Sequence, residues 1–451
     1  MANLPYGINA WIFLNEDEPS GTHYNSANSC YQSLVKFGVY KDVTFLGIAF
    51  FEVISTAHGY TIEIGDSSHP DGLNNQDYLK SVLHDARQIN PDIKFLATMG
   101  YSGEQTLAEI FIGGGDPKTQ AHAFANNLVS YLKSHHMNGV DIDWEPPLSD
   151  HMTKANFQIL FSTIRQVFDQ QSETFYLSFT PAWPTQTTDY PTVNSAFDFV
   201  SPQFYDGTPL IRFLNAGISP DKIGYGAQFE PGNSVPNASA QQVWHQVSEG
   251  FAKDDKTYKY QDIFVWRFNS GNFQFEQAQF MILYQLASRP TGHSFDDEPV
   301  VGAAGYPQMT QIMIRSGDVL DSIQTENTGM GTYNQGTQKT GTGVFTLLSH
   351  GGNSGDPLGV NIPFDDPIVS VCGFTGLWYD WECVLQLTLT GKSGITYGPF
   401  GTMAGASTQK AFTQSAGEGQ SVVAFRGTTV TVSLSDGRQT DIIASLDAIF
   451  A

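Results

Sequence analysis

The stretch NGVDIDWEPP, residues 138–147, carries three carboxylates in an otherwise apolar run. Asp141, Asp143 and Glu145 stand at every second position, although only 15% of the residues in the chain are charged. Because successive side chains of a β-strand point to opposite faces, the three acids share one face and the apolar residues between them share the other. The pattern therefore predicts a buried strand with one acidic face.

Strand-like apolar runs and helix-like stretches alternate through the first 290 residues. Together with residues 139–144, the strand-like runs cover 6–13, 42–51, 92–100, 174–183, 197–206, 221–230 and 262–269. Apolar residues at three- and four-residue spacing predict helices over 76–89, 121–136, 155–168, 240–251 and 273–287. Eight strands alternating with helices predict an α/β fold, the (β/α)8 TIM barrel, for residues 1–290. A doubly wound open sheet is the alternative, but no glycine-rich phosphate fingerprint follows the first strand.

In such a barrel the acidic face of residues 139–144 points inward, and Glu145 lies at the C-terminal mouth, where barrel active sites are found. Ile142 and Trp144 would then face the surrounding helices. Carboxylates this close cannot all ionise freely, so at least one should have a raised pKa, and a protonated Glu145 could serve as a general acid. A polar interior without chemistry and a metal site are the alternatives. No histidine stands beside the acids at ligand spacing, and we expect neither a metal nor a cofactor.

The pattern changes after residue 290. A polar stretch, residues 291–300, is expected to be a linker. Beyond it, short β-like runs divided by Gly, Ser and Thr replace the helical period, for example over 309–317, 342–352, 367–376, 383–391 and 421–434. They predict an all-β domain over residues 301–451, as a sandwich, barrel or prism.

The charge balance limits the partners of the chain. The formal net charge is −23, which argues against nucleic acid and anionic membranes and suits neutral ligands such as sugars. Three cysteines form neither a disulfide framework nor a metal-site spacing, and pairing of Cys372 with Cys383 stays open. No signal peptide is recognisable at the N-terminus. We nevertheless expect a secreted or cell-surface location, with a cytoplasmic one as the alternative.

The acidic strand resembles a family signature. NGVDIDWE is similar to D-G-x-D-x-D-x-E, the fourth-strand motif of glycoside hydrolase family 18, which contains chitinases and endo-β-N-acetylglucosaminidases. Asn138 stands where the family has its first Asp. PQFYD, residues 202–206, resembles the sixth-strand segment, and VWRF, residues 265–268, resembles the eighth. The resemblance implies that Tyr205 is the catalytic tyrosine and assigns substrate contacts to four further residues: Gln203, Asp206, Trp266 and Met99.

The resemblance also implies a mechanism in which the substrate takes part. Glu145 would protonate the leaving oxygen, and the 2-acetamido carbonyl of the substrate would attack the anomeric carbon. Asp143 would orient that acetamido group, Asp141 would tune Asp143, and Tyr205 would donate to the carbonyl oxygen. Short connections between the last three predicted strands leave no room for an additional wall domain. They predict an open cleft and endo-type cleavage.

The C-terminal region resembles the jacalin-related lectins, which fold as a three-sheet β-prism. The resemblance lies in IMIRSGDVLDSIQ (312–324), TYGPFG (396–401) and VVAFRG (422–427). GRQTD, residues 437–441, matches the G-x-x-x-D sugar-binding loop of that family. The implied sugar contacts are Gly437, Arg438, Gln439 and Asp441, with Gly305 of GAAG (302–305) facing them. A domain that has lost sugar binding is the alternative.

These expectations combine into one prediction of function. The chain is expected to be a retaining, endo-acting hydrolase of β-1,4-linked N-acetylglucosamine, with a chitin-type substrate and a glycan-binding C-terminal domain. An endo-β-N-acetylglucosaminidase acting on N-glycans is the alternative enzyme. A sugar-binding protein without catalysis is the alternative of another class, although family members that became lectins have typically lost the catalytic Glu, and Glu145 is present.

Overall fold

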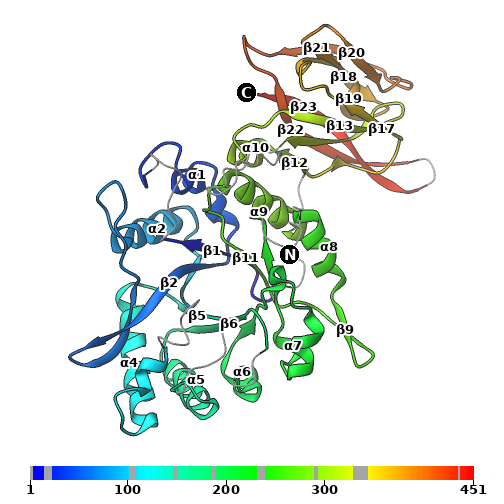
Figure 1. Ribbon diagram of the computed structural model, residues 1–451. Helices are drawn as coiled ribbons and strands as arrows, with labels where there is room; N and C mark the ends of the chain where they lie inside the picture. The colour runs from blue at the N-terminus through cyan, green and yellow to red at the C-terminus, as the bar shows by residue number, and fades with distance from the viewer. Residues whose placement is uncertain are drawn as a thin grey trace. The chain divides into compact units, whose positions relative to one another are not determined.

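The structure is a computed structural model in which two units are distinguished, Met1–Glu276 and Gln277–Ala451 (Figure 1). The residues it describes are 4–14, 23–100, 107–145, 151–184, 188–230, 239–288, 293–328, 344–434 and 437–451. Each unit has its own β-sheets. In the described part of the chain, no helix combines the length and hydrophobicity that are needed to cross a bilayer.

The first unit is a closed barrel of parallel strands, as predicted. Its strands, in their order around the barrel, are β1 (Ile8–Phe13), β2 (Phe45–Thr56), β4 (Lys94–Gly100), β5 (Gly139–Trp144), β6 (Tyr176–Pro181), β7 (Phe199–Val200), β8 (Tyr225–Gln228) and β11 (Ile263–Trp266). β11 pairs with both β8 and β1. Between β7 and β8 the barrel closes through a parallel bridge of Val200 and Ile223, and the Gly224 N–H donates to the Val200 carbonyl at 2.6 Å.

Helices surround the sheet (Figure 1). They are α1 (Cys30–Lys36), α2 (Asn75–Ile89), α4 (Pro117–Ser134), α5 (Lys154–Asp169), α6 (Tyr190–Ala196), α7 (Leu210–Ala216), α8 (Ala240–Glu249) and α9 (Phe273–Ser288). The helices that the apolar period predicts are all present. Buried apolar residues form a stripe along α2, α4, α5 and α8, whereas α9 is buried at eight consecutive positions, 276–283. α1, α6 and α7 escaped prediction because seven residues are too few to show that period. Four short 3-10 turns accompany them: Val39–Asp42, Glu109–Phe111, Phe204–Asp206 (η3) and Pro220–Lys222.

Two antiparallel hairpins were not predicted. β2 continues beyond the barrel and pairs with β3 (Gly59–Ile64), and β9 (Phe251–Lys253) pairs with β10 (Lys256–Tyr258). The helix predicted over 240–251 therefore stops at Glu249. Gly250 follows with a φ of +73°, which an L side chain rarely adopts, and a Cβ there would lie 2.2 Å from the Tyr258 carbonyl oxygen.

The second unit has three antiparallel sheets, which make it a β-prism. The first contains β12 (Ser294–Asp296), β22 (Val422–Ser433) and β23 (Gln439–Phe450). The second contains β13 (Met309–Ser316), β14 (Leu320–Thr328), β15 (Val344–Thr346), β16 (His350–Gly351) and β17 (Asp356–Asn361). The third contains β18 (Ile368–Trp378), β19 (Trp381–Gly391), β20 (Thr396–Phe400) and β21 (Lys410–Ser415). A helix, α10 (Glu298–Ala303), precedes β13.

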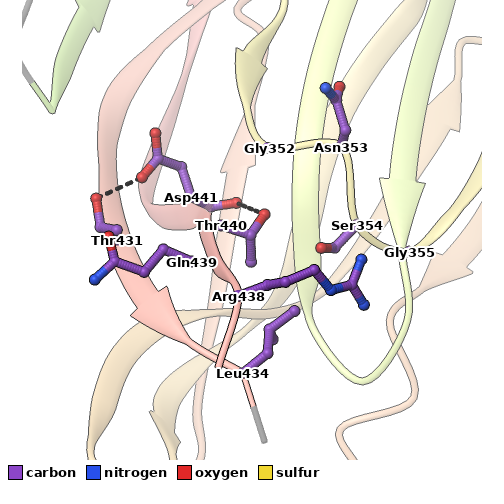
Figure 2. Close-up of a pocket in the computed structure, with 10 residues that line it drawn as sticks. All are labelled: Gly352, Asn353, Ser354, Gly355, Thr431, Leu434, Arg438, Gln439, Thr440 and Asp441. Carbon is purple, nitrogen blue, oxygen red and sulfur yellow. Dashed lines mark hydrogen bonds between the residues drawn. The ribbon is translucent and has the colours of Figure 1, made fainter. Parts of the chain in front are cut away.

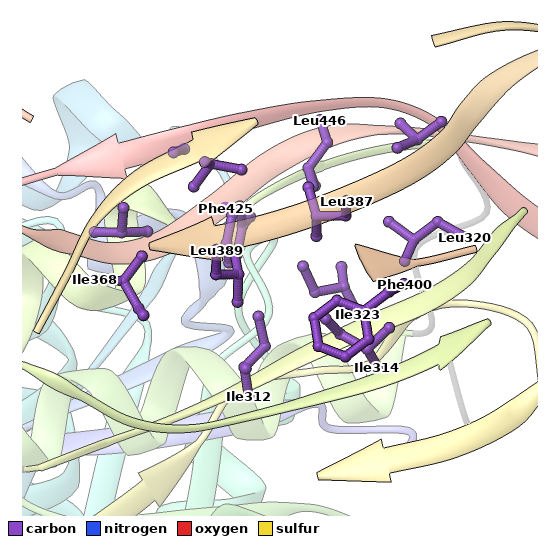
Figure 3. Close-up of a cluster of buried hydrophobic side chains, with 14 of the residues drawn as sticks. Ile312, Ile314, Leu320, Ile323, Ile368, Leu387, Leu389, Phe400, Phe425 and Leu446 are labelled. Atoms are coloured by element: carbon purple, nitrogen blue, oxygen red, sulfur yellow. The ribbon is translucent and has the colours of Figure 1, made fainter. Parts of the chain in front are cut away.

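All three sheets contribute to one core in this unit (Figure 3). Ile312 and Ile323 come from the second sheet, Leu387 and Leu389 from the third, and Phe425 from the first, and each is at most 1% exposed. At roughly 25 cal/mol per Å² of buried apolar surface, such side chains contribute about 2 kcal/mol each to the free energy of folding. The alternating pattern of the strands follows from this arrangement, because each sheet turns one face to the shared core.

The polar stretch expected to be a linker does not merely connect the units. β12 pairs with β22, with Ser294 opposite Thr428 and Asp296 opposite Arg426, and α10 begins at Glu298. One proline, Pro299, and several charged residues at 291–300 suggested an irregular segment, whereas three residues at the edge of a sheet are too few to show alternation. The predicted domain limits otherwise stay a prediction. Cys372 and Cys383 do not form a disulfide, and Cys372 lies opposite Thr388 whereas Cys383 lies opposite Gly376.

Candidate active site and lectin pocket

The acidic face of β5 points into the barrel. Asp141 is fully buried and accepts hydrogen bonds from Ser178 Oγ at 2.6 Å, Thr180 Oγ1 at 2.9 Å and Trp11 Nε1 at 3.0 Å. Burial raises the pKa of the Asp141 carboxyl, and the hydrogen bonds from Ser178, Thr180 and Trp11 oppose that rise. The other face of β5 meets the helices, since the Trp144 ring lies 5.2 Å from that of Phe157 in α5.

Gln203 connects Asp143 and Glu145, the two acids that lie nearest the mouth of the barrel. Its Nε2 donates to Asp143 Oδ1 at 2.6 Å and reaches Glu145 Oε1 at 3.4 Å. Asp143 and Gln203 are both buried, at 6% and 3% exposure. The backbone of β4 passes close to this group, because a Cβ on Gly100 would lie 2.3 Å from the Cβ of Asp143. The amide and the neighbouring glycine together hold Asp143 in one place.

Glu145 follows the last residue of β5 and is partly exposed. Burial raises the pKa of its carboxyl, the Asp206 charge raises it further, and the hydrogen bond from Gln203 opposes both effects. Burial also raises the pKa of Asp206. The protonated form of Glu145 is thereby favoured at the barrel mouth, which is what a general acid requires.

Tyr205 lies beside the acids. η3 begins at Phe204, four residues after β7 ends at Val200, and carries Tyr205 into this region. Burial raises the pKa of its hydroxyl well above the ordinary value, and the charges of Asp143, Asp206, Glu145 and Asp141 add to the effect, in that order. The hydroxyl therefore stays protonated and available as a hydrogen-bond donor over a wide pH range.

Aromatic rings form one wall of the mouth. Trp266, the last residue of β11, lies 6.0 Å from Phe50 with the rings 29° apart, and 5.8 Å from Trp11. Phe13, at the end of β1, lies 5.4 Å from Phe50. Trp266, Phe13 and Phe50 are all partly exposed. Such rings suit the apolar face of a sugar, and the two phenylalanines are site residues that the sequence reasoning missed.

Three polar residues near this wall were also missed. Gln228 lies opposite Trp266 in the sheet and is 7% exposed. Arg267 donates from Nη2 to Glu230 Oε1 at 2.8 Å and from Nε to Glu230 Oε2 at 3.2 Å. They lie at or just beyond the ends of β8 and β11, within the last residues of the predicted strands, and this is the signal that could have found them, since barrel sites are built from strand ends.

Met99 is the site residue whose predicted position is wrong. In the sheet it lies opposite Ile142, whereas Thr98 and Gly100 lie opposite Asp141 and Asp143. Because side chains alternate along a strand, Met99 points away from the acids towards the outside of the barrel, and it is 1% exposed.

Asn138 and Gly139 explain the start of the signature. Asn138 Oδ1 accepts a hydrogen bond from the Phe95 N–H at 3.0 Å, a role that needs an oxygen but no charge. A Cβ on Gly139 would lie 2.0 Å from the Tyr176 carbonyl oxygen, so the neighbouring strand excludes any side chain there. Both residues thus serve the packing of β5 at the end remote from Glu145.

The second unit contains a pocket of about 680 Å³ around the predicted lectin loop (Figure 2). Its lining residues are Gly352, Asn353, Ser354, Gly355, Thr431, Leu434, Arg438, Gln439, Thr440 and Asp441. Thr431 Oγ1 donates to Asp441 Oδ1 at 2.6 Å, which fixes the carboxylate at the pocket wall. The pocket brings Arg438, Gln439 and Asp441 together, as the lectin resemblance implies.

The glycine-rich segment that faces Asp441 is not the predicted one. Residues 352–355 line the pocket, and a Cβ on Gly352 would lie 2.2 Å from Thr440 Oγ1. Gly305 instead follows α10, where its N–H donates to the Gly302 carbonyl at 3.0 Å. Gly437 occupies the β22–β23 turn with a φ of +82° and does not line the pocket. The run HGGNSG, residues 350–355, is the sequence signal that was overlooked.

Comparison with known proteins assigns both units. Residues 20–243 match the family model of glycosyl hydrolases family 18, and residues 286–433 match that of the jacalin-like lectin domain. Chitinase A1 from Niallia circulans is 30% identical over 95 residues, which make up 19% of this chain and 13% of that protein. The match thus spans only a small part of that relative's length.

Solved structures of both kinds are similar to the chain. A fungal endo-β-N-acetylglucosaminidase from glycosyl hydrolase family 18 is 14% identical with a TM-score of 0.44, and the match covers 62% of this chain and 99% of that one. AcmJRL, a mannose binding jacalin related lectin from Ananas comosus, is 25% identical with a TM-score of 0.23, over 36% of this chain and 92% of that one. From the two family matches, the chain consists of a glycosyl hydrolases family 18 domain followed by a jacalin-like lectin domain.

Proposed function

We propose that the barrel is a retaining, endo-acting glycoside hydrolase that cleaves β-1,4-linked N-acetylglucosamine. The observation that carries the proposal is the arrangement of Asp141, Asp143 and Glu145 along the inner face of β5, with the pKa of Glu145 raised at the mouth and Tyr205 beside it. Substrate-assisted glycoside hydrolysis needs a proton donor, a carboxylate that orients the acetamido group and a buried acid beside that carboxylate.

The reaction would proceed in two steps. Glu145 gives its proton to the glycosidic oxygen while the acetamido oxygen of the substrate bonds to the anomeric carbon, and the bond to the leaving sugar breaks. Asp143 stabilises the positive charge on the acetamido nitrogen, and Tyr205 donates to the acetamido oxygen. Water then bonds to the anomeric carbon while the bond from that carbon to the acetamido oxygen breaks, and Glu145 takes a proton from the water. Two inversions leave the β-configuration unchanged.

Two subordinate proposals accompany the activity. Chitin-type chains are the proposed substrate, with the chitobiose core of N-glycans as the alternative. The pocket around Asp441 is proposed to bind glycans, since a fixed carboxylate beside hydroxyl and amide groups suits sugar hydroxyls. A secreted or cell-surface location stays a proposal, which assaying the culture medium and cell fractions for the protein would test.

The decisive experiment compares substrates and one variant. The wild-type protein is incubated with chitin oligomers and, separately, with a high-mannose glycoprotein, and the products are separated by chromatography that resolves anomers. We expect β-anomeric products from internal cleavage of chitin oligomers. Release of N-glycans alone would make the alternative enzyme the correct one, and cleavage of neither would leave a sugar-binding protein.

Replacing the acid tests the mechanism. Glu145→Gln should lower kcat at least about 100-fold, because the amide has no proton to give, while oligomer binding is retained. Glu249→Gln, an identical change on the exposed end of α8, should leave kcat unchanged. Wild-type turnover by Glu145→Gln would refute the assignment of the general acid.

A further inference from the structure

A second buried carboxyl lies in the barrel and has no role in the proposed steps. Asp262 immediately precedes β11 and is fully buried, as are Asn9 and Ser201. Asn9 Nδ2 donates to Asp262 Oδ2 at 2.9 Å, and Ser201 Oγ lies 3.0 Å and 2.9 Å from the two carboxyl oxygens. Burying a carboxyl is unfavourable unless hydrogen bonds compensate for lost hydration, and these bonds provide that compensation.

Asp262 touches the strands on both sides of the barrel seam. A Cβ on Gly224, just before β8, would lie 1.6 Å from Asp262 Oδ1, so the carboxyl occupies space that only a glycine leaves free. Gly224 N–H donates to the Val200 carbonyl, which closes the seam between β7 and β8. On the other side, Asn9 Oδ1 accepts from the N–H of Phe45 in β2. One carboxyl thus connects β1, β7 and β8, and through Asn9 it reaches β2.

Each of the two hydrogen-bond partners of Asp262 is followed, two positions later, by a residue of the candidate site. Two residues after Asn9 is Trp11, which donates to the lowest acid of β5, and two after Ser201 is Gln203, which donates to the middle acid. Asn9 and Trp11 share a face of β1, because they are two positions apart on one strand, and Ser201 and Gln203 belong to the short segment that joins β7 to η3. A change in how Asp262 holds Asn9 or Ser201 would therefore be passed on to Trp11 and Gln203.

Charge also couples Asp262 to the acids of β5. Burial raises the pKa of Asp262 to about 7, hydrogen bonds from Ser201 and Asn9 oppose the rise, and the charge of Asp141 adds to it. Asp262 also contributes to the raised pKa of Tyr6, which precedes β1. Electrostatic coupling is reciprocal, so an ionised Asp262 makes it harder for Asp141 to lose its proton.

We propose that Asp262 is a positioning residue of the barrel site. It holds β1 and the segment after β7 so that Trp11 and Gln203 meet the acids of β5, and its negative charge favours the protonated form of Asp141. This inference rests on the proposed hydrolase function. It concerns a residue outside the family motifs, directly before the eighth barrel strand rather than on the fourth.

Asp262→Asn tests the proposal, because it keeps the shape and removes the charge. Above pH 7 the wild-type Asp262 is ionised and opposes the ionisation of Asp141, so its loss should let the acids of β5 deprotonate at lower pH. The alkaline limb of kcat/KM for chitin oligomers should move to lower pH by about half a unit. Loosened Trp11 and Gln203 should lower kcat about tenfold, with KM unchanged.

Two further variants complete the test: one is a control, and the other replaces Asp262→Asn if that variant does not fold. Asp198→Asn is the matched control, since Asp198 is a partly buried carboxyl that pairs with Arg165 and accepts from the Leu177 N–H. It should lower the melting temperature without moving the alkaline limb. If Asp262→Asn does not fold, Ser201→Ala serves instead, because it removes hydrogen bonds to the ionised carboxyl and should shift the limb in the same direction by less.

Unchanged kcat and an unchanged alkaline limb in Asp262→Asn would overturn the proposal. If the wild-type protein cleaves no substrate, the proposed function fails, and infrared titration of the unliganded protein then decides about Asp262. The protonated-carboxyl bands of the remaining acids should titrate at lower pH in Asp262→Asn than in the wild type. Identical titration of those bands would refute the coupling independently of turnover.

Discussion

Two close contacts fix the position of Asp143, the middle acid of β5. Gly100 allows β4 to pass Asp143 at a distance that excludes any Cβ, since the added atom would lie 2.3 Å from the Cβ of Asp143. On its other side, Gln203 donates to the Asp143 carboxylate at 2.6 Å. Asp143 is thus held between a missing side chain and a hydrogen bond, and neither could be recognised from the acidic motif alone.

Gly100→Ala should therefore displace Asp143. The methyl group overlaps the Asp143 side chain, so we expect kcat to fall about 100-fold, as displacements of about 1 Å do in enzyme sites. The free energy of unfolding should fall by about 1–3 kcal/mol. Gly113→Ala is the control, because nothing lies within 4 Å of its added Cβ. Equal kcat values for the two variants, measured on chitin oligomers, would show that the contact with Asp143 does not matter.

At the scale of elements, the shortness of β7 brings the tyrosine to the site. The predicted strand over 197–206 ends at Val200, because Pro202 has no N–H for the sheet. The chain then turns into η3, which carries Tyr205 beside the acids. A strand that covered the whole predicted range, 197–206, would have pointed every second side chain into the barrel instead. The early end of β7 is thus part of how the site is built.

The start of α9 supplies a pH-dependent contribution to stability. Glu276 is fully buried, and burial raises the pKa of its carboxyl to about 8, while hydrogen bonds from Ser270 oppose the rise. The folded protein then binds a proton that the unfolded chain releases near the ordinary pKa of Glu. Stability should consequently fall as the pH rises from about 4.5 towards 8.

Glu276→Gln should remove that decline. The amide stays neutral and can still accept from the Ser270 N–H, so the melting temperature at pH 8 should exceed that of the wild type by roughly 4 °C. At pH 4.5 the two proteins should melt at similar temperatures. Calorimetry over this pH range measures both values, and parallel pH dependences of the two proteins would contradict the buried, protonated state of Glu276.

On the scale of the whole molecule, two units with separate cores carry separate candidate sites. The barrel site is built on β5, β7 and β11, and the lectin pocket on β22, β23 and the segment 352–355. Each site draws its residues from one unit. Binding at the pocket and hydrolysis at the barrel should therefore respond to different substitutions.

Asp441→Ala tests this separation. The variant loses the carboxylate that Thr431 holds at the pocket wall, so affinity for glycans on an array should fall at least about tenfold. Cleavage of short chitin oligomers should be unchanged. Asp447→Ala, on the same strand but outside the pocket, is the control for binding. A loss of oligomer cleavage in Asp441→Ala, or unaltered glycan binding, would contradict the assignment.

The sequence by itself determined the barrel and the location of its acids. Eight apolar runs separated by helical periods define the (β/α)8 fold, and the spacing of Asp141, Asp143 and Glu145 defines a face, because both are local periodicities of the backbone. The β-prism was predicted from a family resemblance. The residue pattern of short strands identifies each strand but does not indicate which distant strand it pairs with. Strand edges such as β12 and helices of seven residues were too short to predict.

Contacts between distant segments were decided by the tertiary structure alone. Met99 faces away from the site, and the segment at Gly352, not Gly305, meets Asp441, because register and loop packing depend on neighbours far along the chain. The same holds for Asp262, whose partners Asn9 and Ser201 stand 253 and 61 residues away. Periodicity reports which face a residue occupies, whereas only the closed barrel determines which residues share its interior.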